Sequence, residues 1–422
     1  MKSYIKIKEE IIKKVDKNRD EIINFLQKLI QINSETGKEF KIQQFIANFL
    51  RQINVKVDEF IPEISYLKNQ PGFVPIEIDF KDRPNVVGII KGSGGGRSIL
   101  LNGHVDTITA EPIEAWDVNP FSGKIVDGKI FGRGSSDMKS GVAAMIMAVK
   151  YLRELEVSLR GSIIMEHVVD EEFSGYGTLA CLAKGYTADA GICCETSDLH
   201  IQPACIGRLW FYIDVIGKTS SISNKWTSIS AIEKGMKIVE AINDLEQIRL
   251  RDLTHSLYPD NRGALPCMVC VFKSGNFPSA IPERARLEGS MGTMPYEKVD
   301  EVKRQLEDYI GLVAKVDPWM RKFPPRVSFR PTGGYGAEIP INSPIVSTIT
   351  KAFQEINKVR PVINGRLGGS DTKYLINYGK IPTVIFGPGN TSQMHAINEY
   401  VEIENVIRAV KTIALTVYEW CK

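Results

Sequence analysis

Between residues 138 and 195 the sequence alternates between helical and strand patterns, and this alternation constrains the fold more than any other feature. Small and apolar residues recur at helical spacing over 138–156, and the shorter run GTLACLAKG at 177–185 is also helical. Two apolar, strand-like runs, GSIIMEHVV at 161–169 and ADAGICCE at 188–195, alternate with these helices. Alternation of this kind predicts an α/β fold in which a sheet is covered by helices.

A different pattern occupies the middle of the chain. An alternating strand near residue 208 is followed by a helix at 228–246, strands at 266–273 and 283–291, and a helix at 296–315. This β-α-β-β-α order is typical of a small, ferredoxin-like α+β sandwich. Patterns of the first kind resume after residue 335. We therefore expect a larger α/β domain of residues 1–208 and 335–422, with the sandwich of residues 209–334 inserted into it.

The composition argues against nucleic-acid and membrane partners. The chain of 422 residues carries 53 Lys and Arg against 50 Asp and Glu, and its net charge of +3 includes no long basic block. No apolar run approaches the roughly 18 residues of a membrane-spanning helix. The N-terminal segment has an amphipathic helical pattern and lacks the apolar core of a secretory signal. We therefore expect a cytoplasmic protein.

Seven cysteines are scattered along the chain, and this odd number argues against a disulfide framework. Cys267 and Cys270 form a CxxC pair, but a zinc ribbon needs a second pair, which the sequence lacks. We interpret LPCMVCVF as a strand that packs two small thiols. His167, within IIMEHVVD, is expected to be a core or sheet-face histidine.

Acidic residues and histidines follow five of the apolar, strand-like segments. They occur in LLNGHVDTI, GRGSSDMKSG, VVDEEFSGYGT, CCETSD and GPGNTSQMHAINEY. The residues concerned are His104, Asp106, Asp137, Asp170, Glu171, Glu172, Glu195 and His395. Because ligands of an open α/β sheet bind at the carboxyl ends of its strands, five such ends can converge on one point.

Some of these residues have simpler interpretations when taken alone. His104 is equally well explained as a satisfied histidine at a strand end, and Asp137 as the cap of the helix that follows it. His104 and Asp106 lie two residues apart, so in a strand their side chains face the same way and the carboxylate can influence the imidazole. As a group, two histidines and at least three carboxylates suit two divalent zinc ions, or cobalt or manganese.

Taken in order, these motifs resemble the M20 family of dinuclear zinc hydrolases, which includes acetylornithine deacetylase, succinyl-diaminopimelate desuccinylase, aminoacylase-1 and carboxypeptidase G2. The resemblance is carried by LLNGHVDT, NPFSGKIVDGKIFGRGSSDMKSGVAAMI, DEEFSGYGT, the glutamate of CCE, and MHAINEYV, and it covers almost the whole chain. The fourth motif and the segment at 66–88 look most like the acetylornithine deacetylase and desuccinylase branch. The resemblance implies a zinc-aminopeptidase-like catalytic sheet and an inserted dimerisation domain.

The resemblance also implies a set of metal ligands. His104 and Glu195 would hold one zinc ion, Glu172 and His395 would hold the other, and Asp137 would bridge the two. A cis peptide directly after Asp137 is also typical of the family.

Two further acids complete the implied machinery. Asp106 would orient His104, and Glu171 would be the general base. A water that bridges two zinc ions has its pKa lowered towards roughly 7. Glu171 would take its proton and then deliver it to the leaving nitrogen of an amide. Asp170 has no such role, and we expect it to support the turn that follows.

The inserted domain departs from the family pattern. Its loop usually carries a histidine that crosses a dimer interface to polarise the scissile carbonyl, and the corresponding position here is Ser221, in VIGKTSSISNKWTSISAIEKG. A hydroxyl is shorter and uncharged, and the loss of one oxyanion donor typically costs about 10²–10³ in rate. The loop glycine of the family falls on Ser228.

The substrate anchors differ as well. The arginine that grips a substrate carboxylate in the desuccinylase falls near Gly292, and a threonine of its C-terminal loop falls near Gly369. Arg208 and Arg366 are candidates to replace them, but a small or uncharged substrate is equally compatible. The candidate substrate-binding residues are therefore Arg208, Ser221, Arg366, Gly368 and Gly369.

We expect a metal-dependent amidohydrolase that removes an acyl group from an N-acyl amino acid or a related small amine, and that forms a homodimer through its inserted domain. Three alternatives stay open. A metallo-exopeptidase acting on dipeptides would use the same zinc centre. A formamide deformylase acting on a pyrimidine needs no carboxylate clamp. A non-enzymatic M20-like binding protein is supported only by the change at Ser221.

Overall fold

The computed structural model describes residues 4–331 and 333–422, which belong to two compact units. The first unit comprises the chain up to Ala204, together with Ile339–Arg366 and Ser370–Lys422. The second comprises Cys205–Glu338 and Leu367–Gly369. The chain thus leaves the first unit and later returns to it, and the divisions lie a few residues from the pattern changes at 208 and 335.

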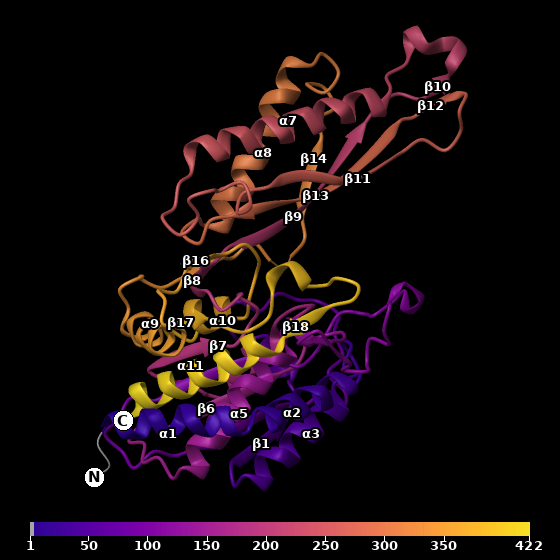
Figure 1. The fold of residues 1–422 in the computed structure, drawn as a ribbon. Helices are drawn as coiled ribbons and strands as arrows, with labels where there is room; N and C mark the ends of the chain where they lie inside the picture. Colours follow the sequence, from indigo (N-terminus) through magenta and orange to yellow (C-terminus); the bar gives the residue numbers. More distant parts are fainter. Residues whose placement is uncertain (1–3, 332) are drawn as a thin grey trace. The chain divides into compact units, whose positions relative to one another are not determined.

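A mixed sheet forms the centre of the first unit (Figure 1). Its strands lie in the order β1 (Lys56–Phe60), β2 (Asn85–Ile90), β6 (Ile163–Val168), β3 (Ile99–His104), β7 (Ala190–Cys193), β17 (Thr383–Ile385) and β8 (Ile201–Cys205), and β16 (Ile363–Arg366) also pairs with β8. The central strands β6, β3, β7 and β17 run parallel to one another, so their carboxyl ends share one edge. The outer pairs β1–β2, β2–β6 and β17–β8 are antiparallel.

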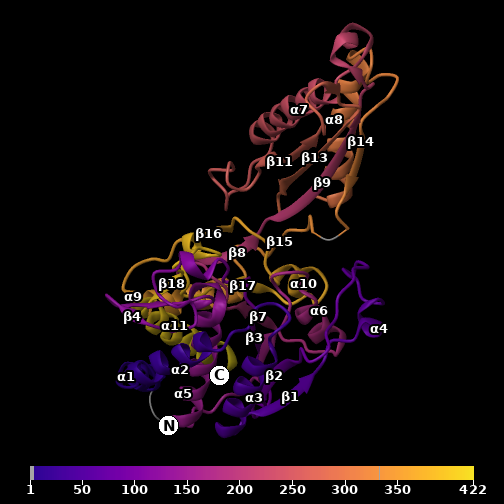
Figure 2. The same ribbon diagram turned by 90° about the vertical axis from the view of Figure 1, so that its right-hand side faces the viewer.

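Helices cover both faces of this sheet (Figures 1 and 2). One layer contains α1 (Tyr4–Lys17), α2 (Arg19–Gln31), α3 (Phe40–Gln52), α5 (Ser140–Glu154), α9 (Pro344–Asn357) and α11 (Ile403–Cys421). The other contains α4 (Ile64–Leu67), α6 (Tyr176–Ala183) and α10 (Thr372–Asn377). Successive side chains of β3 pack alternately against the two helical layers, since strand side chains alternate between the faces of a sheet. Ile99 and Leu101 join the main core, whereas Leu100 packs with Leu375 and Ile381.

The expected N-terminal helix is divided in two at Asn18. The backbone there has φ −112° and ψ 30°, which is not helical, and the side-chain amide donates to the backbone oxygen of Lys14 at 2.6 Å. An asparagine side chain offers the backbone this alternative to the helical hydrogen bonds, so α1 ends at Lys17 and α2 starts at Arg19.

The second unit packs two helices on one antiparallel sheet. In chain order its elements are β9 (Gly207–Ile216), α7 (Ala231–Asp252), β11 (Cys267–Ser274), β13 (Arg284–Thr293), α8 (Val299–Val316) and β14 (Arg326–Phe329). The strands lie in the order β11-β13-β9-β14. Leu209, Phe211 and Ile213, on one face of β9, join residues of both helices in a separate core. The expected fold class, an α/β sheet with an inserted α+β sandwich, is confirmed, and β14 is one of the strands that the sequence patterns did not predict.

Short elements complete the two units. The second carries an extension formed by β10 (Ser220–Ser221), η3 (Ile222–Thr227) and β12 (Ala280–Ile281). The first carries a three-stranded sheet of β18 (Tyr400–Glu402), β5 (Lys129–Phe131) and β4 (Ile125–Val126). The remaining short segments are η1 (Ile113–Ala115), η2 (Ser135–Lys139), β15 (Ala337–Glu338) and η4 (Thr391–Gln393). Within the described residues, no helix is both long and apolar enough to cross a membrane.

The CxxC pair lies on β11, as expected, but its thiols are not packed together. Cys267 is buried, whereas Cys270 is exposed at a bulge where the strand register shifts between Val269 and Val271. The prediction of two packed thiols is therefore wrong for Cys270. His167 is fully buried in β6, which confirms that it is a core histidine.

Candidate metal centre

The carboxyl end of β3 places His104 among several carboxylates. Its side chain is buried, and its two ring nitrogens face different groups. Nδ1 lies 2.9 Å from the backbone oxygen of Asp106 and 3.7 Å from the Oδ1 atom of its carboxylate. Nε2 lies 3.2 Å from both Asp137 Oδ1 and Glu195 Oε2, and 3.9 Å from Glu171 Oε2. The contact at Nδ1 therefore turns Nε2 towards the three carboxylates.

His395 reaches the same group from the loop that follows β17. Its Nε2 lies 3.0 Å from Glu172 Oε2 and 3.6 Å from Asp137 Oδ2. Asp137 therefore directs one carboxylate oxygen towards each histidine. The ligand atoms of His104, Asp137 and Glu172 all lie within 4.8 Å of one another, a spacing that suits a bound metal ion.

Asp137 is not a helix cap. It lies in η2 with φ −114° and ψ 99°, and the residue that precedes α5 is Lys139. The peptide bond between Asp137 and Met138 is cis, as the family resemblance implied. Glu195 follows β7 and the two glutamates follow β6, so segments far apart in the sequence meet at the shared edge of the parallel strands.

The carboxylate of Asp106 holds the backbone of the two glutamates that follow β6. Its Oδ1 accepts a hydrogen bond from the N–H of Glu171 at 3.1 Å, and its Oδ2 accepts one from the N–H of Glu172 at 3.2 Å. The hydroxyl of Thr36 donates to Oδ2 as well, at 3.0 Å. Asp106 is fully buried, so one carboxylate fixes this turn while its own backbone oxygen contacts His104. The sequence predicted only that the carboxylate would orient His104, whereas the backbone oxygen of Asp106 is the atom closer to the imidazole.

Burial and neighbouring charges shift the pKa values of the residues in the cluster. Burial alone would lower the pKa of His104, but its hydrogen bonds to Asp137 and Glu195 raise that pKa well above the usual value. Burial alone would raise the pKa of Glu195, but Arg366 and His104 outweigh it and lower that pKa. For Glu171 burial dominates, and its pKa is raised well above that of an exposed glutamate.

The residues present fit a divalent metal centre. Asp137, Glu171 and Glu195 lie around the buried imidazole of His104, and Glu172 lies beside the half-exposed imidazole of His395. Carboxylates withdrawn from water in this way are stable only when they are paired with cations. Arg366 lies near the Oε1 atom of Glu195 at 3.5 Å, on the oxygen that does not face His104. Imidazole nitrogen and carboxylate oxygen are the donors that zinc accepts, and cobalt and manganese accept them too.

Asp170, the first of three consecutive acids, supports the turn rather than the cluster. Arg83 Nη2 donates to Asp170 Oδ1 at 2.8 Å and to Glu39 Oε1 at 2.7 Å, and all three side chains are buried. Asp170 has a left-handed φ of 70°, and its backbone oxygen accepts from the N–H groups of Ser174 and Gly175. Sequence spacing gave no sign of Arg83 or Glu39.

Glu399 is a further buried carboxylate that the sequence analysis did not single out. It accepts a hydrogen bond from the backbone N–H of Asp137 at 3.0 Å, across 262 residues of sequence. It belongs to the MHAINEYV motif, but nothing in the spacing of that motif points to a contact with GRGSSDMKSG.

Of the candidate substrate-binding residues, Arg366 lies beside the metal cluster. It stands at the end of β16, and its guanidinium contacts Glu195 and donates to the backbone oxygen of Thr196. The side chain is buried. These contacts support Glu195 and leave Arg366 poorly suited to grip a substrate carboxylate.

The other candidates belong to the second unit. Arg208 lies half-buried on β9, where burial lowers its pKa. Ser221 is exposed in β10, and its hydroxyl accepts from the N–H of Ser223 at 3.4 Å. Gly368 and Gly369 are grouped with this unit too.

Gly292, near which the family resemblance predicted the loss of an arginine, lies where the surrounding backbone leaves no space for a side chain. A Cβ atom built on Gly292 would lie 1.9 Å from the backbone oxygen of Ala264. The N–H of Gly292 donates to the backbone oxygen of Pro266. The backbone oxygen of Gly292 accepts from the guanidinium of the buried Arg249. Any side chain here would require the 264–266 backbone to move.

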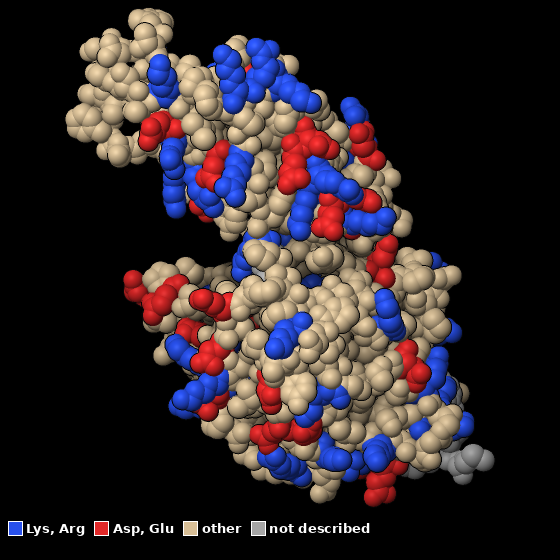
Figure 3. Space-filling model, turned by 180° about the vertical axis from the view of Figure 1, so that it is seen from behind, with Lys and Arg blue, Asp and Glu red and all other residues tan. Residues whose placement is uncertain are grey.

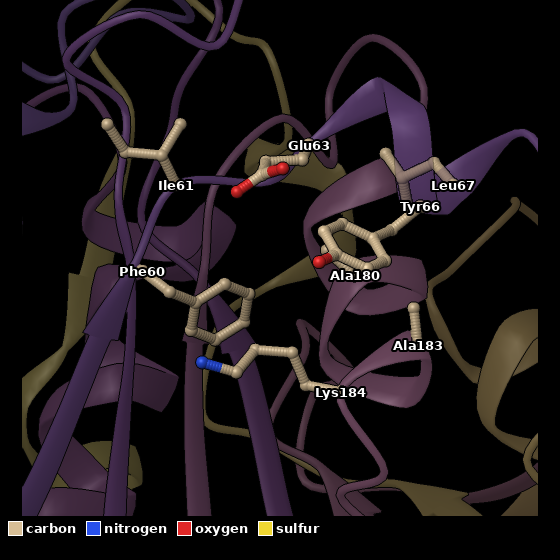
Figure 4. A pocket seen from close by; sticks show the side chains of 8 residues that line it. All are labelled: Phe60, Ile61, Glu63, Tyr66, Leu67, Ala180, Ala183 and Lys184. Carbon is tan, nitrogen blue, oxygen red and sulfur yellow. The ribbon is translucent and has the colours of Figure 1, made fainter.

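A pocket of about 410 Å³ lies elsewhere in the first unit and contains none of the candidate residues (Figure 4). Its wall combines the end of β1, α4 and the last turns of α6. Lys184 extends beneath the ring of Phe60, with Nζ 4.1 Å from the ring centre, and also pairs with Asp58 at 2.9 Å. The cation is thus already engaged, and the pocket is separate from the metal cluster.

Comparison with known proteins decides the family. Residues 100–419 match the family described as peptidase family M20/M25/M40. The chain belongs to this family. The resemblance inferred from the sequence motifs is therefore confirmed.

Two curated relatives extend over nearly the whole chain. Each is an N-formyl-4-amino-5-aminomethyl-2-methylpyrimidine deformylase. The one from Bacillus subtilis is 30% identical, over 97% of this chain and 96% of its own, and the one from Halalkalibacterium halodurans is 29% identical, over 98% and 97%. These relatives confirm the expectation of an amide-cleaving hydrolase.

Solved structures of the family share the fold at low sequence identity. A tripeptidase from Staphylococcus aureus has a TM-score of 0.73 at 20% identity, over 96% of this chain and 99% of its own. A dinuclear metal-binding peptidase of the M20 family from Bacillus subtilis has a TM-score of 0.66 at 16% identity, over the same shares of the two chains. Identities of this size support the fold alone.

Proposed function

We propose that this protein removes a formyl group from an aminomethylpyrimidine, or from a closely similar amine, by metal-dependent hydrolysis of the formamide. The observation that carries the reaction class is the Glu171 carboxyl, which is only 17% exposed and lies 3.9 Å from the Nε2 atom of His104. The deformylase relatives at 29% and 30% identity support the substrate class. A formyl group has no carboxylate to grip, which agrees with the packed backbone at Gly292.

Five side chains would hold two divalent metal ions. His104 and Glu195 would hold one, Glu172 and His395 the other, and Asp137 would bridge them, since its two oxygens face the two histidines. Zinc suits this donor set best, and cobalt or manganese are the alternatives. When bound, the metal ions make water a nucleophile at neutral pH and polarise the formyl oxygen.

Glu171 would carry the proton between water and substrate. Its raised pKa, caused first by burial, brings the carboxyl closer to the working pH, where a general base can also act as a general acid. The carboxylate accepts a proton from the attacking water and returns it to the nitrogen of the departing amine. Asp106 fixes the backbone of Glu171, so the carboxyl is held in place for both transfers.

A metallo-exopeptidase acting on dipeptides is the second candidate. It is supported by the family and by the fold shared with the tripeptidase. Recognition of a peptide carboxylate needs an exposed cation near the cluster, however, and Arg366 is buried against Glu195. The chemistry of the site therefore favours a substrate without a carboxylate.

A substrate panel tests this proposal. The protein, loaded in turn with zinc, cobalt and manganese, is assayed for release of free amine from a formylated aminomethylpyrimidine, from acetyl and succinyl amino acids, and from dipeptides. We expect kcat/KM to be highest for the formamide, by at least about 10²-fold over the other classes. Faster cleavage of dipeptides would identify an exopeptidase, and no cleavage with any metal would favour a binding protein.

Replacement of Asp106 by Asn is expected to lower kcat by about 10²-fold and to weaken metal binding. An amide offers one acceptor oxygen in place of two, so its NH₂ group would face the N–H of Glu171 or of Glu172. Steady-state rates at increasing metal concentration measure the effect. The Thr36→Val variant removes only the hydroxyl donor and should have the smaller effect, whereas a wild-type rate in Asp106→Asn would contradict the role of this carboxylate in the turn.

We also propose that the second unit mediates homodimer formation. Large apolar side chains are exposed on its extension and in the loop that leads into β12: Ile222 is 59% exposed, Trp226 91% and Phe277 65%. Figure 3 shows few charged side chains over this end of the unit. Apolar surface of this kind is commonly covered by a partner. Sedimentation equilibrium of the wild type and of Trp226→Ser would show whether a dimer forms and whether it depends on this extension.

A further inference from the structure

Within the described residues, every hydrogen bond that the Glu399 carboxylate accepts comes from the 133–137 loop, which carries Asp137. Its Oε1 accepts from the N–H groups of Ser136 at 2.7 Å and Asp137 at 3.0 Å. Its Oε2 accepts from the N–H of Gly134 at 2.9 Å and from Arg133 Nη1 at 2.8 Å. Glu399 is fully buried, so water does not compete for these donors.

The backbone of Glu399 is held in place by backbone hydrogen bonds and does not depend on its own side chain. The following residues form β18, which pairs with β5, and the backbone oxygen of Glu399 accepts from the N–H of Gly132 at 2.8 Å. The carboxylate is therefore free to act on its neighbours rather than to hold its own strand in place. Its cost of burial is offset only by the donors of the 133–137 loop.

The same contacts connect the two loops that carry Asp137 and His395. Arg133 Nη1 donates to the backbone oxygen of Ala396 at 3.1 Å as well as to Glu399. The hydroxyl of Ser136 donates to the backbone oxygen of Asn390 at 3.0 Å. His395 itself is half-exposed, with a side-chain exposure of 52%, so packing contributes little to its position. The hydrogen bonds between the two loops therefore have to fix the position of His395.

We propose that Glu399 is a positioning residue that holds Asp137 and the His395 loop in ligand geometry before any metal binds. This inference rests on the metal ligands of the proposed function. It adds a residue that acts through others, because its carboxylate contacts the backbone of Asp137 and the rest of the 133–137 loop rather than a ligand atom of the cluster. The loss of Glu399 should therefore weaken first the ion shared by Asp137, Glu172 and His395.

The Glu399→Gln variant tests this inference by metal binding alone. Glutamine keeps the shape of the side chain but turns an NH₂ group towards the N–H donors on one side of the carboxylate. We expect one of the two metal ions to bind at least about tenfold more weakly, as measured by cobalt titration followed by absorption, while the other ion, which shares Asp137 but not His395, weakens less. At saturating metal, kcat should recover while KM stays unchanged.

Asp317 supplies a matched control in the second unit. Its buried carboxylate accepts from the N–H groups of Trp319 and Met320 and pairs with Lys234 and Lys237, a pattern much like that of Glu399. The Asp317→Asn variant should lower thermal stability without changing either metal affinity. If both variants left the cobalt isotherm unchanged, Glu399 would be a structural residue only.

Hydrogen exchange in the metal-free protein gives a second readout. The amides of Gly134, Ser136 and Asp137 should exchange faster in Glu399→Gln than in the wild type, because their acceptor is impaired. If Glu399→Gln does not fold, Arg133→Lys removes the guanidinium that joins Glu399 to Ala396, and the same amides should respond to a smaller extent. Unchanged exchange in a folded variant would overturn the inference.

The outcomes for Glu399 and for the proposed reaction can be told apart. Weaker binding of one metal in Glu399→Gln, with no hydrolysis of any amide by the wild type, would retain the positioning role and reject the proposed function. Deformylation by the wild type, with unchanged metal binding in the variant, would retain the function and reject the positioning role.

Discussion

Replacement of Glu171 by Gln is expected to lower kcat by about 10³-fold while both metal ions stay bound. Glutamine has the same shape as glutamate but does not accept a proton from water at neutral pH. The backbone N–H of residue 171 would still donate to Asp106, so the turn that holds Glu172 should persist. The variant therefore separates proton transfer from the architecture of the site.

The raised pKa of Glu171 adds a pH dependence to this result. In the wild type, loss of activity at low pH follows protonation of the base, and burial moves this transition above the range of an exposed glutamate. The acid limb of the kcat profile should be absent from the residual activity of Glu171→Gln. Metal analysis of the same sample serves as the control, and Glu172→Gln should lose an ion. A Glu171→Gln enzyme with wild-type kcat would refute the assignment of the base.

Much of the fold could be predicted because its cores are built from periodic patterns. The alternation of Ile99, Leu100 and Leu101 between two faces of the sheet is visible in the sequence as a continuous apolar run. β14 was missed because its four residues, RVSF, are partly exposed and begin with a charged residue. The break at Asn18 was missed because a single side-chain hydrogen bond, not a change of pattern, ends α1.

The candidate site was predictable to the extent that its residues lie at strand ends. His104 is the last residue of β3, Glu172 and Glu195 follow β6 and β7, and the topology alone brings the ends of these parallel strands together. Partners that come from distant segments left no comparable signal. Nothing in the sequence around Glu39 and Arg83, which hold Asp170, or around Glu399 indicates their partners, and only the folded chain shows that they are buried together with them.

The substrate contacts were the least predictable part, for a physical reason. Arg366 looks like a free cation in the sequence, yet its guanidinium is used by Glu195 and Thr196. In the sequence, Gly292 is interpreted only as a position where an arginine is missing. In the structure, the close approach of the Ala264 backbone leaves no space for any side chain there. Substrate recognition depends on such local packing, which neither periodicity nor motif spacing encodes.

The run of three acids after β6 illustrates how neighbours in sequence acquire separate tasks. Asp170 accepts a hydrogen bond from Arg83. Glu171 lies 3.9 Å from the Nε2 atom of His104, and Glu172 lies beside His395. Asp106 satisfies the N–H groups of the second and third acids, so their backbone is fixed while their side chains diverge. The repulsion expected of adjacent carboxylates is reduced because each of them faces a different positive or metal-ligating group.

Replacement of His395 by Ala is expected to reduce the metal content from two ions per chain to one and to lower kcat by at least about 10²-fold. Removal of a residue that merely supports a ligand already costs up to this amount, so removal of a ligand itself should cost no less. Without the imidazole, Asp137 and Glu172 would be the protein ligands left for the second ion. Elemental analysis after dialysis against trace metal, combined with steady-state rates, measures both effects.

The exposure of His395 makes this the cleanest of the ligand substitutions. Its side chain is 52% exposed, so alanine leaves no internal cavity, whereas the same change at the buried His104 would also destabilise the core. His395 has a left-handed φ of 62°, and the variant His395→Asn, whose side chain tolerates that conformation, controls for backbone strain. Both variants should melt near the wild-type temperature in metal-free buffer. Two tightly bound ions in both of them would mean that His395 is not a ligand.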